Sequence, residues 1–245
     1  MFTFGEFKNF FKYYAEEEHQ DKALSVLYNS MPKHLLMADA SWVETYRQKP
    51  KSEEQTNEAI PWPLSKDELA QIMGCSKESL PDSLMDDLAV CVSLYNMNTL
   101  SLAYFLGQCG HESAGLRYPV EIHSGTDYEW RHDLGNIYPG DGVKYAGTGW
   151  IQVTGRYNHQ RFSDYLDEQG KSDYKIMEEG KRYTSEKYPW SISGFWWNDN
   201  GMNEYCQGYP DTDAVGARVN GKYLPNGYLD RREYTNRAFK VLHVD

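Results

Sequence analysis

Residues 105–116 read FLGQCGHESAGL, and this stretch indicates a helical fold because it is an apolar helical run that ends in a carboxylate. Leu102, Phe105 and Cys109 recur at the three- and four-residue spacing of one helix face, and Glu112 is the next position on that face. We therefore expect Glu112 to point toward the core. Desolvation there, together with the negative end of the helix, would favour the protonated form of its carboxyl group.

The composition indicates a globular protein without nucleic-acid or membrane partners. The chain has 245 residues, 40% of them hydrophobic and 15% aromatic, which is enough to build a core. Its formal net charge is -11, and no segment supplies the clustered Lys and Arg that nucleic acids and anionic membranes require. No apolar stretch is long enough to cross a bilayer, and the N-terminus has no basic region followed by an apolar run. We expect a monomer with no signal peptide.

The cysteines do not indicate a metal site or a disulfide framework. Cys75, Cys91, Cys109 and Cys206 have neither metal-type pair spacing nor the density of a disulfide scaffold. We expect reduced thiols that are mostly buried.

The hydrophobic pattern predicts two units. Residues 1–60 combine a small helical region, with a second helix starting at Pro32, and a polar, proline-containing linker. Residues 61–245 form the second unit, in which helical patterns predominate. A boundary is expected near residue 60.

Within the second unit, helices are predicted on both sides of a long irregular segment. Ser65 and Glu68 have the spacing of a capping box for a helix over LSKDELAQIM, and further helices are predicted over 83–95 and 99–113. Residues 114–150 are rich in Gly, Asp, Tyr and Pro, and irregular segments of that length usually carry function. The C-terminal stretch VGARVNGKYLPNGYLDRREYTNRAFKVL predicts a helix, a turn and a final helix.

The sequence lacks the motifs of three other kinds of catalytic or binding site. A zinc protease helix needs H-E-x-x-H, but Gly115 stands where His111 and Glu112 require the second histidine. The glycines of PGDGVKYAGTGW lack the G-K-[ST] of a phosphate-binding loop. Ser113 has no G-x-S-x-G turn around it.

A second carboxylate makes acid–base chemistry a candidate. Taken alone, Glu112 is more typical of a helix-terminal residue paired with an arginine. Glu129, however, lies in the polar stretch TDYEWRHD with Arg131 two residues on, where it is expected to stay ionised. Two acids in opposed environments suit glycoside hydrolysis, in which a gap of roughly 6.5–9.5 Å between the carboxyls admits a water.

Aromatic and amide side chains surround the two glutamates in sequence. The aromatic residues are Tyr128, Trp130, Tyr138, Tyr145, Trp150 and Tyr157, and the polar ones are Gln152, Thr154 and Asn158. Stacking on sugar rings and packing in the core are equally compatible with these aromatic residues. For Trp190, Phe195, Trp196 and Trp197 in PWSISGFWW we expect core packing.

Three stretches in this order resemble the signatures of family 19 glycoside hydrolases, a family of chitinases and phage endolysins. They are FLGQCGHESAGL, SGTDYEWRHDLGNIYPGDGVKYAGTGWIQVTGRYN and RVNGKYLPNGYLDRREY. The match runs from about Leu64 to the C-terminus, and the YExRxDLGN and PGDG elements are most similar to the lysozyme-like branch found in phage. The resemblance implies a mainly α, lysozyme-like, two-lobed helical domain with a central cleft.

The resemblance also implies roles for single residues. It implies that Glu112 is the general acid, Glu129 the general base, and Thr154 a residue that holds the attacking water. Arg231 matches an arginine that interacts with the acid. The residues implied or expected to bind substrate are His111, Tyr128, Gln152, Asn158, Tyr145, Trp150, Asn220 and Arg231.

The implied activity is an inverting hydrolysis of β-1,4 bonds in N-acetylglucosamine-containing chains, with no metal and no cofactor. The first hypothesis is an endolysin that cleaves peptidoglycan. The alternatives are a chitinase, a catalytically silent glycan-binding or virion protein, and a lytic transglycosylase that needs one glutamate. A lysin without a signal peptide would stay in the host cytoplasm until released to the cell wall, or would be virion-associated.

The sequence departs from the family pattern at two positions. Thr148 stands between Gly147 and Gly149 where most members have arginine, and His159 stands where a tyrosine often follows the asparagine of RYN. Residues 1–60 lie outside the family's catalytic domain, and they are either a wall-targeting unit or a structural appendage.

Overall fold

The protein is described by a computed structural model that covers residues 4, 8, 18–30 and 64–244. The chain divides into two compact units, residues 1–59 and 60–245. In the first unit, helix α2 (Glu18–Ser30) carries Asp21, whose carboxylate pairs with Lys8 at 2.9 Å. The predicted helix at Pro32, the linker and the boundary near residue 60 lie outside the described residues.

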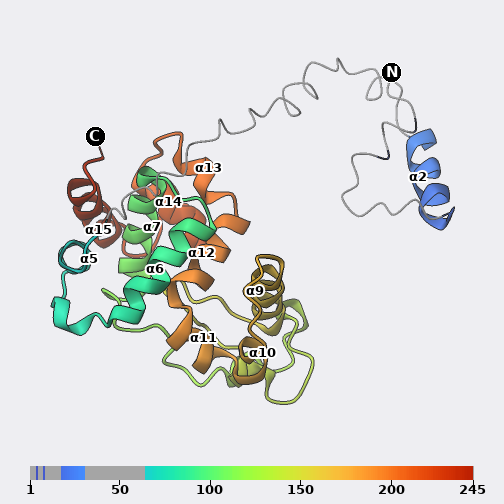
Figure 1. The fold of residues 1–245 in the computed structure, drawn as a ribbon, viewed down its shortest axis with the longest axis horizontal. Coiled ribbons are helices and arrows are strands. Elements are labelled where there is room, and N and C mark those ends of the chain that lie inside the picture. Colours follow the sequence, from blue (N-terminus) through green and yellow to red (C-terminus); the bar gives the residue numbers. More distant parts are fainter. Residues whose placement is uncertain (1–3, 5–7, 9–17, 31–63, 245) are drawn as a thin grey trace. The chain divides into compact units, whose positions relative to one another are not determined.

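The second unit is built from helices of very different lengths (Figure 1). The longer ones are α5 (Lys66–Met73), α6 (Asp82–Leu94), α7 (Thr99–Glu112), α9 (Arg156–Glu168), α11 (Lys181–Lys187), α12 (Pro189–Asp199), α14 (Thr212–Asn220) and α15 (Tyr228–Val241). Short turns of helix lie between them: η1 (Lys77–Ser79), η2 (Thr126–Tyr128), η3 (His132–Leu134), α8 (Asp141–Lys144), α10 (Lys175–Glu179) and α13 (Met202–Cys206).

Local signals place the first helices of this unit. Ser65 accepts a hydrogen bond from the amide of Glu68, whose carboxylate accepts one from the amide of Ser65, so the predicted capping box is present. Helix α7 begins after Asn98, whose side chain accepts a hydrogen bond from the amide of Ser101. The helices predicted over 83–95, over 99–113 and in the C-terminal stretch are confirmed by α6, α7, α14 and α15.

Helix α7 runs through the middle of the core. Its residues 101–110 are all buried, and α15 packs along it with α5, α12, α13 and α14 around the pair. Gly107 permits the close approach of α15, because a Cβ there would lie 2.9 Å from the Cα of Thr235. A helix buried on every side has no single apolar face.

A second group of helices, α9 to α11, lies beside this core together with the irregular segment 114–155 (Figure 1). Residues 64–244 contain no β-strand and only the isolated bridges of Thr148 with Val120 and Val153. The mainly α fold class is therefore confirmed. None of the described helices is long and apolar enough to cross a membrane.

A buried carboxylate connects α6 to the start of α12. Asp87 accepts hydrogen bonds from the backbone amides of Trp190 (2.7 Å) and Ser191 (3.2 Å), and from the Ser191 hydroxyl at 2.5 Å. Burial raises the pKa of Asp87 to about 6, although these hydrogen bonds act in the opposite direction. A side chain from one helix thus satisfies the free amides of another.

Core packing of the PWSISGFWW aromatics is confirmed. Trp190, Phe195 and Trp197 are buried, and Trp196 packs against the core from a partly buried position. The expectation for the cysteines is also confirmed as to burial, since Cys91, Cys109 and Cys206 are buried and Cys75 is partly exposed.

Candidate active site

Glu112 is the last residue of α7, and Arg231 of α15 lies against it. The guanidinium of Arg231 donates to Glu112 Oε1 at 2.5 Å, to Gln108 Oε1 at 2.6 Å and to the carbonyl of Asn226 at 2.9 Å. Arg231 is completely buried, whereas the Glu112 side chain is 25% exposed. The contact implied by the family resemblance is therefore present.

The expectation that Glu112 has apolar surroundings is wrong. The three- and four-residue spacing suggested a core-facing stripe, but α7 is buried on all sides only as far as Gly110. Glu112 lies where the helix emerges from the core, with a full positive charge beside it. The acid is accessible at one end and held by a guanidinium at the other.

The neighbouring residues on both helices form a second pair. His111 Nδ1 lies 2.6 Å from Asp230 Oδ2, so consecutive residues of α7 contact consecutive residues of α15. The His111 ring also packs on Gly227, where a Cβ would come within 2.0 Å of it. The contact with Asp230 engages one nitrogen of the His111 ring. Substrate binding by His111 stays a prediction.

Glu129 is held by backbone amides rather than by a cation. Its two carboxylate oxygens accept hydrogen bonds from the amides of Gly140 (2.6 Å) and Gly142 (2.8 Å) in the PGDG turn. The expected neighbour Arg131 turns instead to Asp133, with contacts of 2.7 and 2.5 Å. Each oxygen of Glu129 keeps a second lone pair for another donor.

The PGDG turn is itself fixed by an ion pair that the sequence did not reveal. Asp141 is 1% exposed and accepts hydrogen bonds from two nitrogens of the Arg156 guanidinium, Nε at 2.8 Å and Nη2 at 2.6 Å. It also accepts hydrogen bonds from the amides of Ile137 and Tyr138. Burial raises the pKa of Asp141, but the hydrogen bonds from Arg156, Tyr138 and Ile137 outweigh it and leave the pKa below its usual value. This pair gives Glu129 a rigid support.

A third carboxylate, Glu121, connects the segments that carry the candidate residues. It accepts hydrogen bonds from the Tyr128 hydroxyl (2.9 Å) and the Gly147 amide (3.0 Å), and its own amide donates to the Gly147 carbonyl at 2.9 Å. Tyr128, predicted to bind substrate, thus has its hydroxyl directed to the protein. No motif in the sequence marks Glu121.

Gln152, Thr154 and Asn158 are brought together at the start of α9. The Gln152 amide donates to the carbonyl of Gly149 (3.0 Å) and, more weakly, to that of Tyr118 (3.3 Å). The Thr154 hydroxyl donates to the Gln152 carbonyl at 3.0 Å, and the Asn158 amide to the Thr154 carbonyl at 2.8 Å. All three side chains donate to backbone carbonyls, and their predicted contacts with water and substrate stay predictions.

Two of the predicted sugar-binding aromatics lie in the core. Tyr145 is fully buried and donates to the Met177 carbonyl at 2.8 Å, and Trp150 is 3% exposed and packs edge-on against Trp190. Stacking on a sugar is therefore wrong for these two side chains as the structure places them. Their burial depends on partners distant in sequence.

Three other aromatic residues of the segment, for which sugar stacking and core packing were equally compatible, lie at the surface. Trp130, Tyr138 and Tyr157 are each more than half exposed. The guanidinium of Arg156 lies over the Tyr138 ring at 4.9 Å. These rings, rather than the two buried ones, are free to contact a glycan.

The positions that depart from the family pattern are both buried. Thr148 is fully buried and bridges to Val120 and Val153 through its backbone. His159 is also fully buried, and desolvation lowers its pKa to about 4. Asn220, the last predicted contact, is partly exposed at the end of α14 and accepts a hydrogen bond from the Asn226 amide at 3.0 Å.

Known proteins resemble the chain in sequence and in fold. No family model matches it. Over 160 residues it is 28% identical to a glycosyl hydrolase family 19 domain-containing protein of Haemophilus influenzae, an alignment covering 46% of this chain and 78% of that protein. The resemblance to family 19 glycoside hydrolases is thereby confirmed.

Solved structures share the fold at low sequence identity. A family 19, class IV chitinase from Zea mays superposes with a TM-score of 0.57 at 15% identity, covering 75% of this chain and 94% of the chitinase. Chitinase C from Streptomyces griseus gives a TM-score of 0.54 at 16% identity, covering 74% and 93%. The described helical unit thus has the fold of these chitinases.

Proposed function

We propose that this chain is a glycoside hydrolase that cleaves β-1,4 bonds in N-acetylglucosamine-containing glycans, with Glu112 as general acid and Glu129 as general base. The observation that carries the proposal is the different support of the two carboxylates. A buried guanidinium holds Glu112, whereas two backbone amides hold Glu129. The family 19 relative and the family 19 chitinase folds support the same reaction class.

In this mechanism each glutamate performs one proton transfer. Glu112 protonates the oxygen of the leaving sugar, and Arg231 fixes the orientation of its carboxyl group. Glu129 uses a free lone pair to take a proton from a water that attacks the sugar from the opposite face. Thr154, close to Gln152 at the start of α9, is the proposed contact for that water.

We propose peptidoglycan as the substrate and an endolysin as the biological role. The YExRxDLGN and PGDG elements, which support this choice, are also the segments that hold Glu129. In this role the protein would collect in the host cytoplasm and reach the wall after release. Chitin is the second candidate, because the similar solved structures are described as chitinases.

Replacement of Glu112 tests the catalytic assignment. We expect Glu112→Gln to lower the rate of glycan hydrolysis by at least about 100-fold while the far-UV circular dichroism spectrum is retained. The matched control is Glu168→Gln, a change at an exposed glutamate at the end of α9. Normal lysis of cell walls by Glu112→Gln would contradict the proposal.

Mass spectrometry of the products then distinguishes the candidate activities. New reducing ends from purified peptidoglycan support hydrolysis of the wall, whereas turnover of chitin oligomers beside intact peptidoglycan supports a chitinase. Anhydro-muramyl ends indicate a lytic transglycosylase, for which Glu129 is dispensable. Binding of glycan without any cleavage indicates a silent glycan-binding protein.

A further inference from the structure

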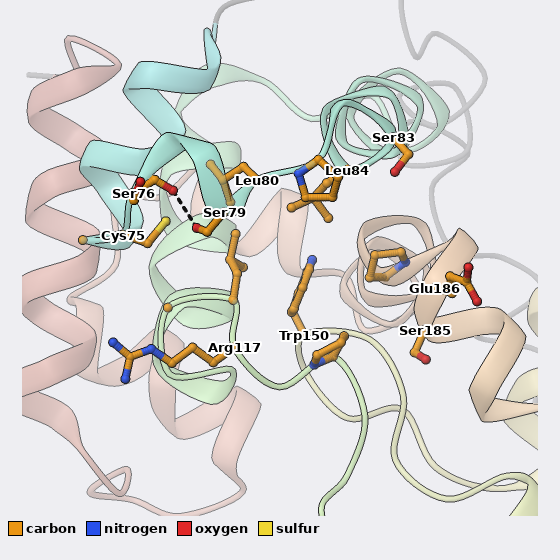
Figure 2. A pocket seen from close by; sticks show the side chains of 16 residues that line it. Cys75, Ser76, Ser79, Leu80, Ser83, Leu84, Arg117, Trp150, Ser185 and Glu186 are labelled. Carbon is orange, nitrogen blue, oxygen red and sulfur yellow. Dashed lines mark hydrogen bonds between the residues drawn. The ribbon is translucent and has the colours of Figure 1, made fainter.

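A pocket of about 650 Å³ lies on the second unit next to the candidate active site. Three parts of the chain line it: residues 74–84, residues 115–119, and Trp150 together with residues 185–189 (Figure 2). Neither Glu112 nor Glu129 is among the lining residues. A volume of this size accommodates a ligand of several residues or a small molecule.

The wall of this pocket continues directly from the candidate acid. Ser113, the residue after Glu112, is buried, and its carbonyl accepts hydrogen bonds from the amides of Arg117 (2.9 Å) and Tyr118 (3.2 Å). The Tyr118 carbonyl in turn accepts from the Gln152 side chain at 3.3 Å. A ligand held in this pocket therefore lies against the same loop that follows Glu112.

Two opposite charges stand on opposite sides of the pocket. Figure 2 shows Arg117 on one side and Glu186 on the other, with Leu80, Leu84 and Trp150 between them. Within the part of the chain that the structure describes, no ion pair engages Arg117 or Glu186. The pocket thus has an apolar middle, with Arg117 and Glu186 at its two edges.

We propose that this pocket binds the peptide that peptidoglycan strands carry, a proposal that rests on peptidoglycan being the substrate. A peptide stem has a carboxylate for Arg117, an amino group for Glu186 and small apolar side chains for the surface between them. The uncharged sugar chain of chitin would leave both charges unused. The pocket would then add affinity for peptide-bearing glycan beside the site of cleavage.

Kinetics on glycans with and without peptides test this proposal. Arg117→Gln and Glu186→Gln should each raise KM for intact peptidoglycan by about three- to tenfold, the size expected for loss of one charged contact, and leave kcat unchanged. The KM for glycan strands whose peptides have been removed by an amidase should not change. Arg182→Gln is the matched control, because Arg182 is 84% exposed and does not line the pocket.

Direct binding separates this proposal from the proposed catalytic function. Isothermal titration with the tetrapeptide L-Ala-γ-D-Glu-L-Lys-D-Ala should show binding to the wild-type protein that both variants weaken. Absence of heat with the wild-type protein, or an equal KM for both glycans in every variant, would overturn the pocket assignment while hydrolysis persists. Absence of hydrolysis of every glycan would instead overturn the catalytic proposal, whatever the peptide titration gives.

Discussion

At the scale of single residues, Gly142 sets how closely the PGDG turn approaches Glu129. A Cβ at this position would lie 2.5 Å from the backbone nitrogen of Glu129 and 2.7 Å from the Gly125 carbonyl oxygen. Both contacts are with backbone, which cannot move aside as a flexible side chain does. The glycine is therefore required for the amide of Gly142 to reach the carboxylate.

We predict that Gly142→Ala displaces Glu129 and lowers both activity and stability. Overpacking of this kind typically costs about 1–3 kcal/mol of unfolding free energy, measured here by urea denaturation. The drop in kcat should exceed that of the control Gly208→Ala, where the nearest atom to a new Cβ is a carbonyl oxygen at 3.5 Å. Equal kcat in the two variants would show that the turn does not position the base.

From the sequence, a contact partner within the site was predicted correctly, whereas the exposure of two aromatic residues was not. The resemblance implied that Arg231 contacts Glu112, and the two groups are hydrogen-bonded. Tyr145 and Trp150 were expected at a sugar surface but are buried, because Met177 and Trp190 cover them. Such coverage comes from tertiary packing, which an irregular segment without periodicity does not encode locally.

At the scale of elements, the interaction of α6 with α12 depends on Asp87. This side chain supplies the acceptors that the amides of Trp190 and Ser191 need at the start of α12. Helix starts are usually capped by the residue just before them, but Tyr188 makes no such side-chain bond here. The cap therefore also joins two helices.

We predict that Asp87→Ala lowers the unfolding free energy by about 2–3 kcal/mol at pH 7, because it leaves buried amides without acceptors. The neighbouring exposed residue provides the control, and Asp86→Ala should stay within about 0.5 kcal/mol of wild type. Chemical denaturation of both variants measures the difference. Similar values for the two would mean that the amides find other partners.

Helix positions were predictable where the signal is local. The capping box predicted at Ser65 is formed by residues at the start of the helix itself, and α5 begins where this signal indicates. The Asp87 cap joins residues 103 positions apart, so no local pattern reveals it. The apolar stripe leading to Glu112 was misread for the same reason, since the burial of α7 on every face comes from distant helices.

At the scale of the whole molecule, a buried imidazole makes stability depend on pH. His159 is fully buried, and desolvation lowers its pKa to about 4 from the ordinary value of 6.5. Between pH 4 and pH 6.5, therefore, the imidazole is mostly protonated in the unfolded chain and mostly neutral in the folded chain. The stability that His159 contributes is complete above pH 6.5 and is lost as the pH falls toward 4.

We predict that His159→Phe removes this acid sensitivity. Between pH 7 and pH 4 the unfolding free energy of the variant should rise relative to wild type by about 3 kcal/mol, from the 1.36 kcal/mol of each pKa unit. Asp87, whose raised pKa acts with the opposite sign in the same range, is present in both proteins and cancels in the difference. A difference that does not vary with pH would show that His159 titrates normally.

The paired contacts of His111 with Asp230 and of Glu112 with Arg231 join residues 119 positions apart in the sequence. When residue 112 emerges from the ribosome, α15 has not yet been synthesised, so neither contact can form. During that interval the chain has its acid but not the guanidinium that orients it. Synthesis itself thus delays the assembly of the site until the last helix has docked along α7.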